Sequence, residues 1–548
     1  MQTSPSTHPA VISPWSPLRR TVFRTIWIAS VASSVGTWMQ TVGVGWLLTS
    51  LTPSPLLVAL MQTATSLPVF LLGLPAGTFS DLLDRRKLLL FTEGWLLLMA
   101  ALLGVLTLSG HVSAWLLLGI TFLMGLGAAF DAPAWQSIVA ELVPREELPA
   151  AVSLNATGFN LARALGPALG GIIVALAGPA AVFLLNSASF ICVLAAIYFW
   201  KREKVVRSSP PEDMLGATAS GIRYTRHSPP MQAVLVRIAT FSIGASALWA
   251  LLPIVARRDL ALDAGWYGAV LGSLGFGAVI SALFMPRVRA VMPVDRLVAI
   301  STLLFAAATL ALAYVRFVPM LVLCMMVGGM GWLTSMSSMT TAATTAAPAW
   351  VRARTLGMYL LVFQGSMAAS SFAWGSLAEK FGNTFTLTCA AGVLALGLLT
   401  FRRWALHPIQ HLDLNPSGHW NDPKILLTPA ADDGPVLVTV EYRVAEERAA
   451  EFLEAMEDMR VFRRREGAVR WDLYRDLADP ERFVESFVTP TWAEHMRTHE
   501  RVTVEDQATE ERAFAFLKPG FQQFATHLIA ARTYDQRPPV EPPYSEVS

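Results

Sequence analysis

The chain has 548 residues, of which 53% are hydrophobic and only 15% are charged, and its net charge is +2. Because an average soluble domain has about 25% charged residues, this composition excludes a disordered chain and argues against an ordinary water-soluble enzyme. A net charge so close to zero also argues against a nucleic-acid partner.

The charged residues are unevenly distributed along the chain. Residues 1–403 contain 26 basic and 14 acidic residues and therefore carry a net charge of +12. Residues 404–548 contain 16 basic and 26 acidic residues and carry a net charge of −10. This contrast predicts a membrane domain followed by a soluble domain, with the boundary near residues 401–403.

The first predicted element is a polar segment, residues 1–22, which is rich in proline and serine and lacks the features of a signal peptide. Twelve apolar runs follow, and each has about the 20 residues that a helix needs to cross a bilayer. They are residues 23–50, 55–79, 87–109, 112–138, 150–176, 178–200, 232–256, 264–286, 293–315, 317–346, 354–376 and 383–402. The predicted fold class is an all-α membrane protein with twelve transmembrane helices.

A polar loop at residues 201–231 divides these helices into two halves, residues 23–200 and 232–402. The halves resemble each other, because Pro144 and Pro348 precede the fifth and the eleventh run, and Gly171 and Gly375 follow them 27 residues later. Matched halves are typical of secondary transporters, which rock around a central binding site. A channel or a sensor needs no such duplication.

The distribution of lysine and arginine predicts how the helices are oriented. If the N-terminus is cytoplasmic, the inside segments hold 20 basic residues and the outside loops hold 4. Cytoplasmic loops of membrane proteins carry the excess of basic residues. We therefore expect a multi-pass protein of the cell (inner) membrane, embedded in the lipid bilayer, with both termini in the cytoplasm.

A basic motif follows the second predicted helix. Its marked residues are Gly77, Asp81, Asp84, Arg85, Arg86 and Lys87. The motif resembles the signature of the major facilitator superfamily, although Leu82 and Asp84 replace a basic residue and a glycine. The resemblance implies a gating latch, in which Asp81 faces the start of the eleventh helix after Arg352 and Arg354. The alternative is a generic basic loop that only sets the orientation.

A glycine-rich motif lies in the fifth predicted helix. It consists of Ala162, Arg163, Gly166, Pro167, Gly170 and Gly171. Small residues four apart allow close packing of helices, and an internal proline bends a helix. The motif resembles the antiporter motif of the same superfamily, which implies export in exchange for protons. Only this motif and the family resemblance disfavour an importer.

The surrounding stretch, residues 131–167, resembles the enterobactin-exporter-like branch of the superfamily. Its marks include Asp131-Ala-Pro-Ala-Trp135-Gln136-Ser and Asn160-Leu-Ala-Arg163-Ala-Leu-Gly166-Pro167. The resemblance implies a transporter, not an enzyme, that exports siderophores or drug-like molecules without a cofactor.

Four ionisable residues, Glu93, Asp131, Arg163 and Arg237, fall inside predicted spans. A charge at this depth costs about 2.5–3.5 kcal/mol on insertion scales and usually marks a transport pathway or an ion pair. We expect an Asp131–Arg163 pair, which either takes part in proton coupling or holds two helices together. Glu93 is the second candidate for proton coupling, unless it pairs with the basic loop at residues 85–87. Arg237 is expected to reach the interface.

By analogy with the family, helices 1, 4, 7 and 10 should line the substrate cavity. Aromatic and amide side chains on these helices suit large, partly apolar substrates. The candidates are Trp38, Gln40, Trp135, Gln136, Trp249 and Trp332. The alternative is that they pack between helices or face lipid.

After a linker at residues 403–434, residues 435–535 show a β-α-β-β-α-β pattern, which is ferredoxin-like, and residues 536–548 are expected to be disordered. The domain resembles dimeric, cofactor-free antibiotic-biosynthesis monooxygenases, which implies dimerisation and leaves a membrane-anchored enzyme or regulator as the alternative function. His495 and His499 have the i,i+4 spacing of zinc ligands, but no third ligand is evident and no metal site is predicted. A remnant active site, dimer packing and a helix surface remain open.

Overall fold

A computed structural model describes residues 13–200, 214–406, 409, 412–420, 423, 425–426 and 429–531. For residues 74, 77–82, 140, 145 and 214–218 it describes the backbone alone. The chain forms two compact units. The helical unit comprises Met1–Pro210, Leu235–Thr340 and Tyr359–Ala405, and the mixed unit comprises Pro211–Val234, Thr341–Met358 and Leu406–Ser548.

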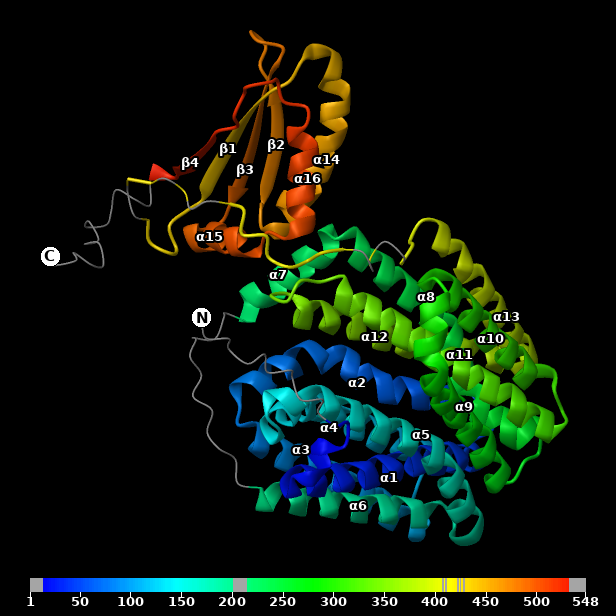
Figure 1. The fold of residues 1–548 in the computed structure, drawn as a ribbon. Helices are drawn as coiled ribbons and strands as arrows, with labels where there is room; N and C mark the ends of the chain where they lie inside the picture. The colour runs from blue at the N-terminus through cyan, green and yellow to red at the C-terminus, as the bar shows by residue number, and fades with distance from the viewer. Residues whose placement is uncertain are drawn as a thin grey trace, which may run out of the picture. The chain divides into compact units, whose positions relative to one another are not determined.

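The first half of the helical unit contains six long helices. These are α1 (Thr21–Leu51), α2 (Pro55–Leu82), α3 (Arg85–Leu108), α4 (Ala114–Leu142), α5 (Leu148–Ala177) and α6 (Pro179–Phe199). The second half contains α8 (Pro229–Ile254), α9 (Ala264–Val291), α10 (Val294–Tyr314), α11 (Val318–Thr345), α12 (Arg352–Phe381) and α13 (Asn383–Gly397). Figure 1 shows the two sets as two bundles.

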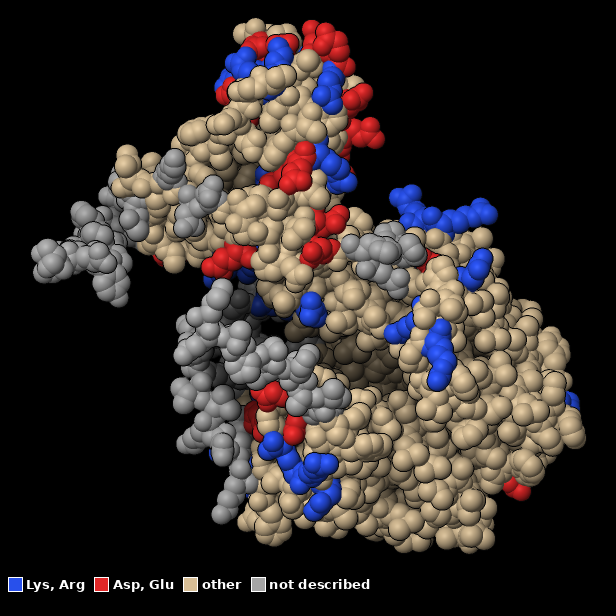
Figure 2. Space-filling model, in the orientation of Figure 1, with Lys and Arg blue, Asp and Glu red and all other residues tan. Residues whose placement is uncertain are grey.

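Eleven helices of the described residues are long and apolar enough to cross a membrane. α1 is not among them, because its serine, threonine and glutamine side chains lower its hydropathy. In Figure 2 the surface of the helical unit carries few charged side chains, as expected of a surface that faces lipid. The predicted all-α membrane fold is therefore confirmed.

Local sequence signals set the helix boundaries. Asp84, Ser113 and Asp263 precede α3, α4 and α9, and each side chain accepts a hydrogen bond from a backbone N–H of the first turn, at 3.1, 3.2 and 2.8 Å. Such caps satisfy amide groups that have no partner inside the helix. Between α5 and α6 the chain turns at Gly178, whose φ of 79° favours glycine, and Pro179 starts the next helix.

The loop predicted at residues 201–231 contains a helix that the sequence did not reveal, α7 (Met214–His227). It has charged and polar residues on one side and is too short to span a bilayer. α7 belongs to the mixed unit.

The soluble domain has the predicted strands and both predicted helices, and it adds a third helix, α16. Its elements are β1 (Val436–Arg443), α14 (Ala449–Glu466), β2 (Arg470–Arg475), β3 (Arg482–Thr489), α15 (Trp492–Arg501), α16 (Val504–Phe514) and β4 (Ala525–Ile529). The sheet order is β2-β3-β1-β4, and all neighbours are antiparallel. Figure 1 shows α14 and α16 beside this sheet.

The core of this domain follows from the alternation of β1. Val436, Val438 and Val440 point to one face and are buried, because successive side chains of a strand point to opposite faces. They form one apolar cluster with Phe452 and Phe462 of α14. Part of the predicted linker belongs to the same domain, since Trp420 packs against this cluster.

Candidate functional site

Arg163 lies near the middle of α5, and three tryptophans surround its guanidinium group. The guanidinium carbon lies 5.6 Å from the ring of Trp38, 5.5 Å from that of Trp249 and 5.7 Å from that of Trp332. A cation over an aromatic face is attracted by the ring quadrupole. These four side chains, here called the tryptophan cage, come from both halves, on α1, α5, α8 and α11.

Arg163 and Trp332 of the cage are buried, and the positive charge of Arg163 is not neutralised by any carboxylate of the described residues. Arg163 is only 8% exposed, and its Nε atom has no hydrogen-bond partner. The indole N–H of Trp249 is also buried without a partner. An unpaired buried cation and an unused donor make a suitable environment for an anionic or hydrogen-bond-accepting group.

An aromatic wall extends the cage into the second half. The ring of Trp332 lies 5.3 Å from Trp249, 5.8 Å from Phe241, 5.5 Å from Phe305 and 6.3 Å from Phe363. Aromatic pairs at such distances stabilise each other beyond simple burial. The wall gives the site an apolar side next to its cation.

The predicted Asp131–Arg163 ion pair is wrong. Asp131 faces α3 instead of α5, and its Oδ1 atom accepts a hydrogen bond from the Thr92 hydroxyl at 2.7 Å. Glu93 of α3 also lies between α3 and α4, and its Oε1 atom accepts a hydrogen bond from the Trp135 indole N–H at 3.0 Å. Two carboxyl groups, Glu93 and Asp131, thus lie close enough to interact electrostatically between α3 and α4.

Glu93 is buried and Asp131 is half-buried, and the carboxyl pair has only neutral hydrogen-bond donors among the described residues. Glu93 is 3% exposed, and its Oε2 atom has no partner. The alternative pairing of Glu93 with the basic loop is therefore not found. Arg237 is 1% exposed and forms an ion pair with Asp295 in the first turn of α10, and its reach to the interface stays a prediction.

The described side chains of the basic motif hold the first half together. Arg85 forms an ion pair with Glu141 of α4 at 2.8 Å. Arg86 donates to the carbonyl oxygens of Ile197 and Tyr198 at 3.1 and 2.5 Å, at the end of α6, where cations are favoured.

The latch itself stays a prediction. The side chains of Gly77 and Asp81 lie outside the described residues, and Lys87 is exposed. Arg352 and Arg354 belong to the mixed unit, where they donate to the Ala347 carbonyl at 3.2 Å and to the Ser220 hydroxyl at 2.9 Å.

The glycines of the α5 motif are positions of close helix contact. A Cβ atom on Gly166 would lie 2.5 Å from the Cβ atom of Trp38, and one on Gly170 would lie 2.8 Å from the Cα atom of Met39, both on α1. A Cβ atom on Gly171 would lie 2.8 Å from the Cα atom of Gly268 on α9. α5 is therefore packed backbone to backbone between α1 of its own half and α9 of the other half.

Pro167 contributes to the same contact. Because proline has no N–H, the carbonyl of Arg163, four residues earlier, loses its helical donor. That carbonyl faces Gly275 of α9, where an added Cβ atom would lie 2.2 Å from the oxygen. The residue that carries the cage cation thus also sits at the crossing of the two halves.

Hydrogen bonds between the halves, within the described residues, lie on the side of the helical unit opposite to the N-terminus. Arg257, at the end of α8, donates to Ser50 at 2.8 Å, Ser54 donates to Glu379 at 2.7 Å, and Thr63 donates to the Ala368 carbonyl at 2.9 Å. Figure 2 shows the surface hollowed between the two halves. The helical unit is therefore closed on the side opposite to the N-terminus.

Three of the predicted cavity residues lie outside the tryptophan cage. Gln40 is buried in the first half and accepts a hydrogen bond from Asn186 at 2.5 Å. Trp135 contacts Glu93, and Gln136 is exposed. Two sequence signals could have indicated contacts that were not predicted. Asn186 is a polar residue in the otherwise apolar run of α6, and it contacts Gln40. Gly275 lies in a run with glycine every three or four residues, and it contacts the backbone of Arg163.

The soluble domain has a buried ion network centred on Arg463. This arginine is 5% exposed, and it donates to Glu485 at 3.0 Å and to Glu510 at 2.8 Å. Burial alone would raise the pKa of Glu510, but the charge of Arg463 and the donors His419 and Trp420 hold that pKa below its usual value of 4.5. The network joins α14, β3 and α16 to His419 and Trp420, which lie in the segment predicted to be a linker.

Replacing Arg463 with Met is expected to lower the stability of this domain by about 3–5 kcal/mol, because it leaves two carboxylates buried without a cation. Hydrogen exchange of β1 and β3 in the intact protein would measure the loss. Arg460→Met, at an exposed pair with Glu457, is the control and should change little. Unchanged protection in Arg463→Met would contradict a stabilising network.

The network also makes the stability of the domain depend on pH. Because the pKa of Glu510 is lowered in the fold, the contribution of this carboxylate to stability is present above pH 4.5 and is lost as the pH falls through the lowered value.

Within the mixed unit, the soluble domain contacts segments that flank the membrane helices. Arg223 of α7 forms an ion pair with Glu494 of α15 at 2.7 Å. The guanidinium carbon of Arg501 lies 4.0 Å from the ring of Trp350, in the segment between α11 and α12. Tyr224 of α7 donates to the Ala346 carbonyl of that segment at 3.0 Å. α15 therefore contacts both α7, in the loop between the two halves, and the segment between α11 and α12.

Comparison with known proteins places these features in a family. The sequence pattern of a family described as "transmembrane secretion effector" matches residues 12–534, and so includes the soluble domain. The staphyloferrin A transporter of Staphylococcus aureus is 23% identical over 54% of this chain and 74% of its own length. The multidrug efflux pump Tap of Mycolicibacterium fortuitum is 28% identical over 55% of this chain and 76% of its own length.

Solved structures agree on the fold of the helical part. A bacterial homologue of the human lysosomal transporter Spinster, in an inward-facing and occupied conformation, superposes with a TM-score of 0.57. It covers 71% of this chain and 97% of its own, at 14% sequence identity. At this identity the similarity shows the arrangement of the helices and nothing about the ligand.

Proposed function

The chain belongs to the transmembrane secretion effector family of the major facilitator superfamily, and we propose that it is a proton-coupled exporter of small organic molecules. Membership makes it a multi-pass membrane transporter. The substrate class, the direction of transport and the coupling ion are the proposed parts. We also propose the enterobactin-exporter-like branch, which residues 131–167 resemble.

The tryptophan cage is the observation that carries this function. Arg163 supplies a buried positive charge, and Trp249 and Trp332 supply an apolar aromatic surface contributed by the other half. A substrate with an anionic group next to an aromatic or apolar body would satisfy both. Siderophore-like and drug-like molecules have this character, and the names of the two relatives agree with it.

The cage also suits a mechanism of alternating access. Its members come from both halves, so a rocking motion of one half against the other would open and close it. The halves are joined on the side opposite to the N-terminus, and the excess of basic residues supports the proposal of a cytoplasmic N-terminus at the inner membrane of the cell. On this reading the structure is open to the cytoplasm, where an exporter loads its substrate.

The carboxyl pair is the proposed site of proton coupling. Buried Glu93 and half-buried Asp131 lie side by side and lack a basic partner in the described part of the chain, so ionising both in the membrane would be expensive. A rearrangement of α3 against α4 would change their access to water and release a proton. In the outward-open state, the carboxyl pair would take up another proton from the outside as the substrate leaves.

For the soluble domain we propose a ferredoxin-like fold and an accessory role in the cytoplasm. The strand order β2-β3-β1-β4 is the support for the fold. Support for the role comes from the contacts of α15 with α7 and with the segment between α11 and α12. Dimerisation through this domain stays part of the proposal. An enzymatic activity would be the alternative.

Replacing Arg163 with Gln tests the substrate site. A charge-assisted hydrogen bond contributes about 1.5–3 kcal/mol, so KM for an anionic substrate should rise roughly tenfold to a hundredfold. Substrates without an anionic group should be affected less. The measurement is efflux from an overexpressing strain, first profiled against siderophores and antibiotics and then repeated with the variant.

Lys380→Gln is the matched control, because this exposed basic residue lies at the end of α12, away from the cage. It should transport normally. Equal losses for charged and uncharged substrates in Arg163→Gln would argue for a structural role of the cation. Unchanged transport of every substrate would exclude the cage as the binding site.

A further inference from the structure

Three histidines of the soluble domain come together at one end of the sheet. His495 and His499 are one turn apart on α15, and so lie on the same face of that helix. His527 lies on β4 opposite Val438 of β1, and paired residues of adjacent strands point to the same face of a sheet. That face is the one with the buried valines, so His527 points toward the helices.

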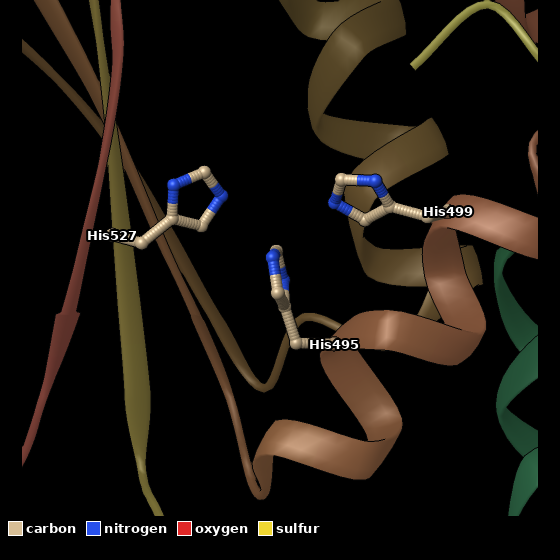
Figure 3. A group of neighbouring side chains, drawn as sticks. All are labelled: His495, His499 and His527. Atoms are coloured by element: carbon tan, nitrogen blue, oxygen red, sulfur yellow. The ribbon is translucent and has the colours of Figure 1, made fainter. Parts of the chain in front are cut away.

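The three rings face a common space. One ring nitrogen of each histidine lies within 4.8 Å of the others. Figure 3 shows nitrogen atoms of His495, His499 and His527 turned toward the space between the rings. The ring centroids of His495 lie 5.0 Å from His499 and 4.9 Å from His527.

His495 has no other role that explains its place. It is 1% exposed, and neither of its ring nitrogens has a hydrogen-bond partner. A buried polar group without a partner costs about 1–3 kcal/mol, so native proteins usually satisfy it. The unused nitrogens of a buried ring that points into the cluster indicate a ligand between the three side chains.

The local electrostatics favour the form of histidine that binds metals. Burial, followed by the nearby His499, His527 and Arg463, lowers the pKa of His495 to about 3. Burial also lowers the pKa of His527. Neutral imidazole is the metal ligand, and the positive charge of Arg463 is balanced by Glu485 and Glu510.

We propose that His495, His499 and His527 bind one divalent first-row transition-metal ion, with Zn²⁺ as the reference ion. Imidazole ligands suit zinc, copper, iron and nickel, and exclude a dedicated magnesium or calcium site. Metal–nitrogen distances of about 2.0–2.1 Å in a tetrahedral site put the nitrogens roughly 3.3 Å apart, so the rings need to turn inward by a small amount. Three protein ligands leave a fourth position for water or an exogenous ligand.

The third ligand is not evident from the sequence, because it is 28 residues after His499 and on a different type of element. The pairing of β4 with β1 supplies it. The site also lies on α15, the helix whose Glu494 and Arg501 contact α7 and Trp350. An ion bound there would brace the helix that touches the flanking segments of the membrane part.

The test is a titration of the purified full-length protein in detergent, after treatment with a chelator. Calorimetry with ZnCl₂ should give one ion per chain, and CoCl₂ should give the strong visible absorption of four-coordinate cobalt. His527→Gln, on an edge strand, and His499→Gln should each weaken zinc binding at least about tenfold. His111→Gln, in the exposed loop before α4, is the control and should bind as the wild type does.

Hydrogen exchange of β1 and β3 would verify that the variants keep the fold of the domain. Binding that is equally tight in His527→Gln and His499→Gln would overturn the site. So would the weak absorption of six-coordinate cobalt in the wild type, or no zinc binding at all. In those cases the three rings would be a packed histidine cluster without a metal.

Discussion

Asp131→Asn is expected to reduce pH-gradient-driven efflux to background while the protein still folds. The amide keeps the size of the side chain and can still accept the hydrogen bond from Thr92, but it has no proton to release. Glu93→Gln should have a similar effect, because the two carboxyl groups lie close enough to interact electrostatically. The measurement is substrate uptake into inside-out vesicles under an imposed pH gradient.

A second measurement separates coupling from binding. Exchange of labelled for unlabelled substrate across the vesicle membrane needs loading and rocking but no net proton transfer, so Asp131→Asn should retain it. Glu146→Gln, an exposed carboxylate just before α5, is the control and should couple normally. Undiminished gradient-driven transport by both Asp131→Asn and Glu93→Gln would remove the pair from the mechanism.

Gly275→Ala is expected to lower transport at least about tenfold. The new methyl group would lie 2.2 Å from the carbonyl oxygen of Arg163 and 2.7 Å from the Cα atom of Ala164, and neither backbone atom can move without shifting α5. Overpacking of this kind costs about 1–3 kcal/mol and would force the two halves apart at their crossing. The efflux rate of each variant, normalised to the amount of folded protein, measures the effect.

Gly392→Ala makes the same chemical change on α13, where an added Cβ atom would meet nothing within 4 Å. It should leave transport unchanged. Normal efflux by Gly275→Ala would mean that α5 and α9 do not need their close approach during the cycle. A loss of folded protein in both variants would instead indicate that glycine is needed for insertion, and not for the crossing.

The membrane fold could be predicted well because it depends on length and composition. An apolar run of about 20 residues has few alternatives to a spanning helix, and the basic loops separate the runs. α7 was not predicted, since a 14-residue polar helix has neither the length nor the apolarity of a spanning helix. α7 takes its place from tertiary contacts, including the pair of Arg223 with Glu494.

The site was predicted only in part, for a physical reason. Position along a helix gives the depth of a side chain but not the direction in which it points. Asp131 and Arg163 were matched by depth, yet Asp131 faces Thr92 on α3 and Arg163 faces the tryptophans. Trp38, Trp249 and Trp332 were named as cavity residues from family analogy, but nothing in the sequence indicated that they surround the same arginine.

The most direct test of the proposed function uses the purified protein in sealed liposomes with a substrate identified by the efflux profile. Transporter molecules whose cytoplasmic side faces the outer medium should accumulate this substrate inside the liposomes, against its gradient, when protons can flow out. A pH-sensitive dye should report that proton flow when substrate is added without an imposed gradient. Transport that continues unchanged after a protonophore collapses the gradient, with no proton movement, would contradict proton-coupled export.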